Sequence, residues 1–539
     1  MTSFGTAVLS CLVAAYATAS PPNIFFILVD DLGYGDVGFN RKEANPEIVS
    51  PNIDQLVASG IHLARHYVHP MCTPTRVSVQ SGRLPVHVNT NLGDPCNDNT
   101  GIPRDMTGFA EHLKRAGYKT HFAGKWDAGM ATPKHTPHGR GYDTSLHYFS
   151  HKNDFWDQTS MQTCCGTNTG RSSIVDFWRT DRGAVDVNNT GYSEFLYQRE
   201  LLEIIEKHNS AEPLLLFYAP HVAHCPLQVP KEYYDKFSYM TDDEDTCKLQ
   251  TIKGAHTIDP RHPDLPYKCR QQYHAMVMLM DEVVGNITHA LKRKGIWDNT
   301  LVIFSSDNGG PVGLNENAAN NWPLLGGKYS HFEGGIRVAA FISGGLVPSH
   351  LHGTTNSGII HIADWYATLC GLAGVDPTDT LAAARGLPPI DSLDVWPFLM
   401  AKVPASPRKT IPISKDCIIQ GDWKLILGKT EPDFWQGPHF PNSSSKEVVR
   451  PAHDCSSGCL FNVAEDWTEQ RNAYTDNPEL AARMNTMLVN LAKSFFENSD
   501  TFENDCPKGT KHCACWMAQN RHGGFLGPYA MTGESSVVI

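Results

Sequence analysis

The sequence predicts an α/β protein built on a doubly wound mixed sheet, followed by a smaller C-terminal α+β domain. Short apolar runs alternate with amphipathic segments of helical periodicity along most of the chain. This alternation is typical of a sheet that is covered by helices on both faces. Polar side chains also cluster directly after several apolar runs, as expected where the carboxyl ends of strands border a ligand crevice.

The predicted strands are short and mostly apolar. Residues 23–29 form a run that ends in Asp30 and Asp31, which is typical of a strand buried on both faces. Three further runs predict strands over residues 120–123, 214–219 and 301–305. The last of these leads into Asp307 and Asn308, so carboxylates follow the first and the last predicted strand.

Helices are predicted where apolar residues recur with helical spacing. In the first part of the chain these segments are residues 51–68, 105–116 and 273–294. Residues 404–408 are rich in proline and basic residues and predict a linker. We therefore expect a large α/β domain over residues 21–403.

The remaining residues, 409–539, are expected to form the smaller α+β domain. Their patterns predict a hairpin over residues 417–427, a strand and turn over 458–472, and an amphipathic helix over 478–496.

The first 20 residues have the pattern of a secretory signal peptide. An apolar run from Ala7 to Ala17 is followed by small residues up to Ala19, although no Lys or Arg precedes it. This run is too short to span a bilayer, and no later segment is long and apolar enough to do so. We expect a mature chain from about Ser20 that is secreted or lysosomal.

Cysteines and sequons agree with that compartment. The chain has 15 cysteines, and in an oxidising compartment disulfides are favoured over zinc for the groups at Cys455/Cys459 and at 506–515. Acceptor sequons for N-glycosylation lie at residues 188, 286 and 442. The net charge of −12 argues against a nucleic-acid partner, and an anionic substrate therefore needs a local positive pocket.

The most informative motif is Cys72-Thr73-Pro74-Thr75-Arg76, followed by Ser81-Gly82-Arg83. Taken alone, Cys72 is more simply interpreted as a half-cystine or a buried thiol. Pro74 fits a helix start, where its missing N–H is not needed, and the first turn of a helix favours an anion. Arg76 lies one turn further on, where it could brace an oxyanion.

The complete motif resembles the signature of the type I sulfatases. In that family the cysteine is oxidised after translation to formylglycine, whose hydrate attacks sulfur and then expels sulfate. The resemblance implies the same modification of Cys72 by a formylglycine-generating enzyme. It covers about residues 22–480, is most marked toward arylsulfatase B and its near relatives, and implies an alkaline-phosphatase-like fold.

Three further positions match basic residues that bind sulfate in the family. Residues 117–126 resemble the second signature and contain Lys125, which outside this context would be interpreted as a surface lysine. His224 precedes Pro-Leu-Gln, and Lys328 precedes the family's Glu-Gly-Gly by five residues. The resemblance implies that Lys125 and Lys328 bind sulfate and that His224 contacts it or protonates the leaving oxygen.

Four oxygen-bearing side chains match the metal ligands of the family. From their local sequence alone, Asp30-Asp31 and Asp307-Asn308 would each be interpreted as turns. Hard oxygen donors suit Ca²⁺ or Mg²⁺. The resemblance implies a divalent cation, Ca²⁺ or alternatively Mg²⁺, held by these four residues and in contact with the formylglycine of Cys72.

One residue departs from the family pattern. The second signature ends Lys-Trp-His in the family but Lys125-Trp126-Asp127 here. An ionised aspartate cannot donate a hydrogen bond, so we expect Asp127 to change the working pH or to neutralise Lys125. His135 and His138 are the residues nearby that could fold back and replace the imidazole.

The sequence thus predicts a sulfuric-ester hydrolase that acts on a sulfated sugar or an aryl sulfate. Two alternatives stay open. A phosphate or phosphonate ester hydrolase of the same superfamily would need a different surrounding for its nucleophile. A catalytically impaired, sulfatase-like glycan-binding protein is supported only by Asp127.

Overall fold

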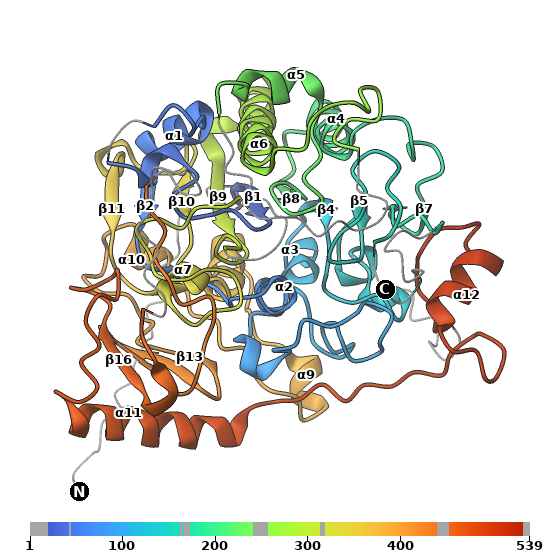
Figure 1. Cartoon of the computed structure of the whole chain (residues 1–539). Helices are drawn as coiled ribbons and strands as arrows, with labels where there is room; N and C mark the ends of the chain where they lie inside the picture. Colours follow the sequence, from blue (N-terminus) through green and yellow to red (C-terminus); the bar gives the residue numbers. More distant parts are fainter. Residues whose placement is uncertain are drawn as a thin grey trace, which may run out of the picture.

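The computed structural model describes residues 20–42, 45–161, 165, 173–240, 257–312, 318–438 and 452–531. Residues 1–19 of the predicted signal peptide and the sequon at residue 442 lie outside these ranges. A ten-stranded sheet forms the centre of the molecule (Figure 1). From edge to edge its strands are β11 (Thr354–Asn356), β2 (Ile61–Leu63), β10 (Ala340–Ser343), β9 (Thr300–Ser306), β1 (Asn23–Val29), β8 (Leu214–Ala219), β4 (Lys119–Lys125), β5 (Thr144–Tyr148), β6 (Trp178–Arg179) and β7 (Arg182–Gly183).

The middle of the sheet is parallel and its edges are mixed. Strands β9, β1, β8, β4 and β5 run in one direction, whereas β10 and β6 pair antiparallel to them. In the central register Phe26 of β1 lies opposite Phe217 of β8 and Ile303 of β9. The carboxyl ends of the five parallel strands therefore meet at one edge of the sheet, as expected for a doubly wound fold.

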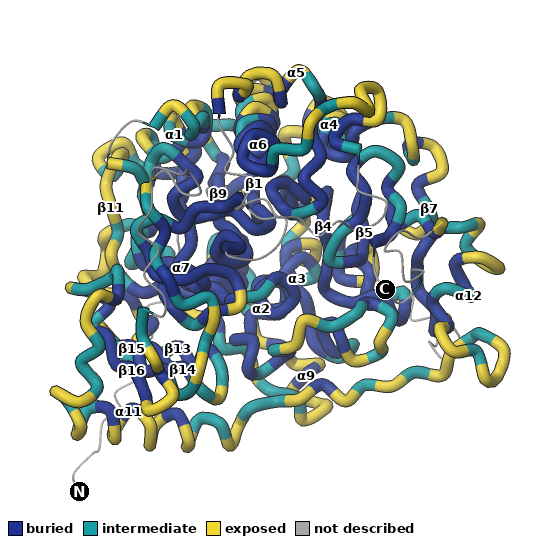
Figure 2. The backbone as a smooth tube through the Cα atoms, in the orientation of Figure 1, coloured by how far each residue is buried: buried dark blue, intermediate teal, exposed yellow. Residues whose placement is uncertain are grey.

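Both faces of the sheet are buried because β1 contributes alternate side chains to two separate hydrophobic cores. Ile24, Phe26 and Leu28 pack into one core, and Phe25 and Ile27 pack into the other. Burying a side chain of this size contributes about 1.5–3 kcal/mol. Figure 2 shows this central layer as the most deeply buried part of the chain. The apolar runs in the sequence reflect this two-sided burial.

Helices cover the two faces. One face carries α1 (Pro51–Ala58), α4 (Ser193–Lys207), α5 (Lys231–Tyr234) and α6 (Cys269–Arg293), and the first three of these helices each contact α6. The other carries α2 (Cys72–Ser81), α3 (Phe109–Arg115) and α8 (Asp364–Ala373). Shorter helices are α7 (Glu333–Ile336), α9 (Thr380–Ala384) and α10 (Trp396–Leu399), and β3 (His66–Tyr67) pairs with β12 (Ile360–His361).

The predicted helix over residues 51–68 is wrong in its second half. Helix α1 ends at Ala58, and Ile61–Leu63 forms strand β2 against β10. Ile61 and Leu63 are buried on either side of a partly exposed residue, so their period of two reflects the strand. Gly60 makes the turn possible, because a Cβ there would lie 2.1 Å from the Ile342 carbonyl oxygen.

A second, antiparallel sheet forms the smaller C-terminal layer. It consists of β13 (Thr410–Ser414), β14 (Cys417–Gln420), β15 (Trp423–Ile426) and β16 (Cys459–Asn462). One face packs on α11 (Pro478–Leu491), and the other packs against Phe332 and Ile336 of the large domain. In the predicted linker, Arg408 is buried and its Nε lies 2.6 Å from Asp364 Oδ2.

The last described residues return to the large domain. Figure 1 shows the chain running from α11 along the base of the molecule to α12 (Cys513–Asn520), beside β7. A disulfide joins Cys165 to Cys515, and two more join Cys455 to Cys459 and Cys506 to Cys513. These cysteines therefore form disulfides, as the sequence predicts. No helix among the described residues is long and apolar enough to cross a membrane.

Candidate active site

Cys72 begins helix α2 at the carboxyl edge of the parallel strands. Its side chain is buried, and its Sγ lies 3.5 Å from Asp30 Oδ1. Burial, followed by the negative charge of Asp307, raises the pKa of the thiol well above its ordinary value. Cys72 is thus a neutral thiol and, without modification, a poor nucleophile at neutral pH.

Asp30-Asp31 and Asp307-Asn308 come together because β1 and β9 are parallel neighbours. Val29 at the end of β1 pairs with Ser306 at the end of β9, so the residues that follow emerge side by side. Asn308 Nδ2 donates to Asp31 Oδ1 at 2.7 Å, and the Asp31 N–H donates to Asp307 Oδ1 at 3.3 Å. The two predicted ligand pairs are therefore one cluster.

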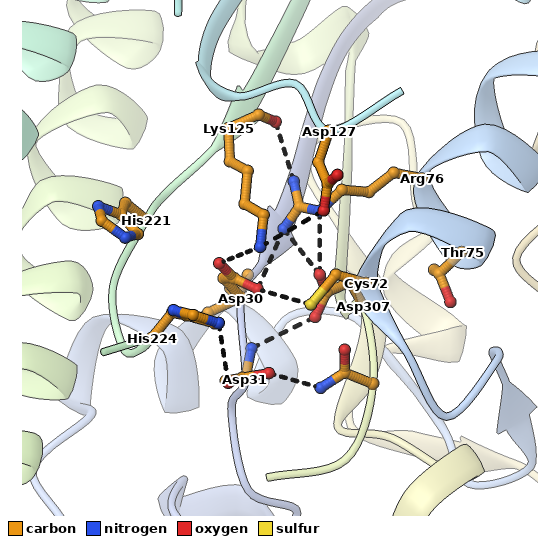
Figure 3. Close-up of polar contacts among 12 residues, drawn as sticks. Asp30, Asp31, Cys72, Thr75, Arg76, Lys125, Asp127, His221, His224 and Asp307 are labelled. Atoms are coloured by element: carbon orange, nitrogen blue, oxygen red, sulfur yellow. Dashed lines mark hydrogen bonds and ion pairs between the residues drawn. The ribbon is translucent and has the colours of Figure 1, made fainter. Parts of the chain in front are cut away.

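Three buried cations oppose three carboxylates in this cluster. Arg76 Nη2 lies 2.8 Å from Asp307 Oδ2, Lys125 Nζ lies 2.8 Å from Asp30 Oδ2, and Lys328 Nζ lies 2.7 Å from Asp31 Oδ1. Figure 3 shows Arg76, Lys125 and the three carboxylates around Cys72. Burial alone would lower the pKa of both lysines, but the nearby carboxylates raise it, so both are cationic.

The donor set fits a hard divalent cation. Ligand atoms of Asp30, Asp31, Cys72 and His224 all lie within 4.8 Å of one another. Asn308 Oδ1 is buried and has no hydrogen-bond partner in the structure, which leaves it free to bind a cation. Burial and the charge of Asp30 raise the pKa of Asp307 to about 6, because they disfavour its ionised form. A bound cation would stabilise the ionised carboxylate. Oxygen donors of this kind favour Ca²⁺ or Mg²⁺.

His224 faces the cluster, whereas His221 lies behind it. The Nδ1 of His224 donates to the Cys225 carbonyl oxygen at 2.7 Å, which directs Nε2 toward Asp31 Oδ2 at 3.5 Å. Burial, then Lys328 and Lys125, lowers the pKa of His224 well below its ordinary value. His221 instead stacks on Phe155, with ring centroids 3.9 Å apart, as the choice of His224 from the sequence implies.

Asp127 lies beside the cluster and is fully paired. It follows β4, and its φ of 45° is a left-handed conformation that Asp tolerates better than most residues. Its Oδ1 accepts from Thr73 Oγ1 at 2.9 Å, and its Oδ2 lies 3.0 Å from His151 Nδ1 and 3.7 Å from Lys125 Nζ. Burial alone would raise its pKa, but His151, Lys125 and Arg76 outweigh burial and lower it.

The imidazole near Asp127 comes from a residue that the sequence analysis missed. His135 bonds to Thr132 and His138 bonds to the Tyr142 carbonyl oxygen, so neither replaces the family histidine. His151 follows strand β5, which was not predicted as a strand. Had that strand been recognised, the same rule about carboxyl ends would have pointed to His151.

Comparisons with known proteins agree with this geometry. The family model described as Sulfatase matches residues 22–375, about two thirds of the chain. The chain belongs to the sulfatase family. It is therefore a sulfuric-ester hydrolase, and its mixed sheet is the alkaline-phosphatase-like fold of that family.

Relatives match over most of their length. Mouse (Mus musculus) arylsulfatase J is 29% identical over 89% of this chain and 77% of its own. N-acetylgalactosamine-6-sulfatase of Mus musculus is 28% identical over 73% of this chain and 69% of its own. The crystal structure of Ps i-CgsB in complex with k-i-k-neocarrahexaose has a TM-score of 0.68 and 27% identity, covering 94% of this chain and 99% of that one. The resemblance to the arylsulfatase B branch stays a prediction.

The matched region contains every predicted site residue, and the structure brings all of them into one cluster. They are Asp30, Asp31, Cys72, Arg76, Lys125, Asp127, His224, Asp307, Asn308 and Lys328.

Proposed function

We propose that this sulfatase removes sulfate from a sulfated carbohydrate by means of a formylglycine derived from Cys72, with Ca²⁺ held by Asp30, Asp31, Asp307 and Asn308. One observation carries the proposal. The buried Cys72 stands at a helix start among three carboxylates, an amide oxygen without a partner and three buried cations. A neutral thiol has no need of these charged groups, whereas a hydrated aldehyde that attacks an anionic ester does. The charged surroundings of Cys72 are therefore useful only after its modification.

Oxidised to the aldehyde and hydrated, Cys72 supplies one hydroxyl to attack sulfur and a second to expel sulfate. Arg76 Nη1 donates to the Lys125 carbonyl oxygen at 2.9 Å and braces the strand end beside the nucleophile. Lys125 and Lys328 bind sulfate oxygens as point charges. His224 presents Nε2 to the same space. The negative charge of a bound sulfate favours the protonated imidazole, and in that form Nε2 donates a proton to the leaving oxygen. A bound Ca²⁺ would polarise the hydroxyl and a sulfate oxygen.

Two observations favour a carbohydrate as the substrate: the names and ligands of the compared proteins, and an exposed aromatic residue beside the site. Two of the compared proteins carry a sugar in their names or ligands. Tyr329 follows Lys328, with a φ of 77° and 42% of its surface exposed. An exposed aromatic face beside sulfate-binding residues is suited to pack on a sugar ring.

Entry into the secretory pathway, with a secreted or lysosomal destination, is part of the proposal. The apolar N-terminal run of the sequence supports it, as do the three disulfides among the described residues. Co-production with a formylglycine-generating enzyme is accordingly needed in any test.

The test is turnover by the full chain, made with that enzyme and supplied with Ca²⁺. We expect release of sulfate from 4-nitrophenyl sulfate and from sulfated N-acetylgalactosamine. Hydrolysis of 4-nitrophenyl phosphate should be much slower than hydrolysis of either sulfate ester. Cys72→Ala should abolish turnover with an unchanged circular dichroism spectrum. Faster hydrolysis of the phosphate ester would favour an ester hydrolase of the other class. Glycan binding without turnover in fully modified protein would favour the glycan-binding alternative.

The aromatic contact has its own control. Tyr329→Ala should raise KM for the sulfated sugar while it changes KM for 4-nitrophenyl sulfate little, because the smaller ester has no sugar ring to pack. Tyr239→Ala removes a comparably exposed tyrosine elsewhere and should change neither. Equal effects of Tyr329→Ala on the two substrates would contradict the sugar-packing role.

A further inference from the structure

The carboxylate of Asp127 has two oxygens with different partners. Oδ1 accepts from Thr73 Oγ1 at 2.9 Å. Oδ2 lies 3.0 Å from His151 Nδ1 but 3.7 Å from Lys125 Nζ. Because a carboxylate only accepts hydrogen bonds, the facing Nδ1 must carry the hydrogen. Oδ2 is therefore held by the imidazole and not by the ammonium group.

We propose that His151 is a positioning residue that keeps the Asp127 carboxylate away from Lys125, so that Lys125 remains available to sulfate. The role rests on the proposed function, in which Lys125 binds a sulfate oxygen. It bears on the departure at position 127. The family signature has an imidazole there, whereas this chain has a carboxylate that pairs with an imidazole from the segment after β5.

The consequence of losing His151 follows from the contacts. Oδ1 would remain tied to Thr73, so the carboxylate stays in place and Oδ2 loses its only partner closer than 3.5 Å among the contacts of the described residues. The nearest cation is then Lys125, which already pairs with Asp30 at 2.8 Å. An ammonium group shared by two buried carboxylates attracts a sulfate ester less than one that is paired with a single carboxylate.

The positions of the two side chains suit this role. Asp127 is buried, with only 2% of its side chain exposed, whereas 15% of the His151 side chain is exposed. His151 lies in the segment that links β5 to Phe155, and Phe155 stacks on His221 in the segment that carries His224. The imidazole thus comes from the wall of the site and points inward at the carboxylate beside Lys125.

The decisive experiment is a double-mutant cycle on substrate binding, with 4-nitrophenyl sulfate as the probe. The full chain is made as Cys72→Ala with Ca²⁺, so that binding is measured by calorimetry without turnover and independently of modification. In that background His151→Ala should weaken binding about tenfold. Asp127→Asn combined with His151→Ala should bind as tightly as Asp127→Asn alone, because no charge remains to approach Lys125. Additive losses, or no loss in His151→Ala, would overturn the role.

Two comparisons keep the result specific. His138→Ala removes an exposed imidazole that bonds to a backbone carbonyl oxygen and should leave binding unchanged. In the active enzyme, His151→Ala should raise KM with little change in kcat. A fall in kcat that Asp127→Asn does not rescue would make His151 a proton carrier and overturn the positioning role. Absence of any probe binding in the Cys72→Ala parent would overturn the proposed function and this role together. If the parent binds the probe but the two substitutions show no coupling, only the role of His151 is overturned.

Discussion

Lys424 Nζ lies 2.9 Å from Glu333 Oε1, and both side chains are fully buried. Lys424 belongs to β15 of the C-terminal sheet, whereas Glu333 begins α7, five residues after Lys328. Lys424 Nζ also donates to the His331 carbonyl oxygen at 2.9 Å. The small domain therefore helps to fix the segment that carries a predicted sulfate-binding lysine, and this buried cation is one of its contacts to that segment, beside the bonds from the Glu333 N–H to Glu469 Oε2 and from the His331 N–H to Thr430 Oγ1.

Replacing this cation should damage both stability and substrate binding. Lys424→Met leaves Glu333 and Glu469 as adjacent buried carboxylates, and breaking a buried ion pair in this way costs about 3–5 kcal/mol. We expect that loss in the free energy of unfolding measured with urea, together with a higher KM. Lys415→Met, at an exposed position of the same domain, is the control. A loss no larger than that of the control would contradict the anchoring role.

Stability should fall as the pH rises from about 4.5 to about 7, with Glu194 as one cause. Burial raises the pKa of Glu194 from 4.5 to about 7, although Tyr218 and the His221 and Val222 N–H groups donate to it. The folded state thus holds a proton that the unfolded state releases. The contribution is fully present below pH 4.5, is lost as the pH rises through about 7, and amounts to at most about 3 kcal/mol.

This pH dependence can be assigned by substitution. Glu194→Gln should flatten the fall in the free energy of unfolding between pH 4.5 and 7, because glutamine does not titrate. Glu203→Gln, on the exposed side of the same helix, should leave the slope unchanged. An unaltered slope in Glu194→Gln would show that this carboxyl does not retain its proton in the fold.

Much of the site could be predicted because its residues lie in short contiguous motifs that resemble those of the sulfatases, whereas local patterns alone indicated only turns and a buried thiol. Asp30 and Asp307 come directly after apolar runs, and parallel strands bring their carboxyl ends together. The nucleophile motif can be recognised in the sequence because Cys72, Pro74 and Arg76 lie close together at a helix start. Neither inference required knowledge of contacts between distant segments.

The remaining features depend on tertiary contacts that leave no local pattern. His151 reaches Asp127 across two neighbouring strands, and β5 is too polar, with Thr144 and His147, to be recognised from its sequence. Similarly, Ile61 and Leu63 continue the apolar spacing of a helix, and only pairing with β10 makes them a strand. Tertiary pairing overrode periodicity in both cases.

Asn308 provides the sharpest test of the metal site. Its buried Oδ1 has no hydrogen-bond partner, so Asn308→Ala removes an oxygen ligand without breaking a bond that this atom makes within the protein. We expect elemental analysis to find about one Ca²⁺ or Mg²⁺ per chain, a lower affinity for it in Asn308→Ala, and its loss in Asp307→Ala. Asn209→Ala, an exposed position, should retain the metal. Stoichiometric zinc with activity that resists calcium chelators would contradict an oxygen-ligand site.

Modification of Cys72 can be separated from ordinary thiol chemistry by comparing it with another buried cysteine. Cys370 is also a buried thiol, and burial raises its pKa to about 12, but it lies within α8 without the Cys-x-Pro-x-Arg sequence. Oxidation to formylglycine replaces the CH₂SH group of cysteine by CHO and lowers the mass of the peptide accordingly.

In protein made with a formylglycine-generating enzyme, mass spectrometry should find this change in the peptide of Cys72 and an intact thiol at Cys370. Because Cys72 is buried at a helix start among charged side chains, the modification must precede folding of the chain around it. Refolding unmodified protein in the presence of the same enzyme should therefore restore much less activity than co-production does. Equal activity from the two routes would show that the site opens enough to admit the modifying enzyme. An unmodified Cys72 in fully active protein would contradict the mechanism itself.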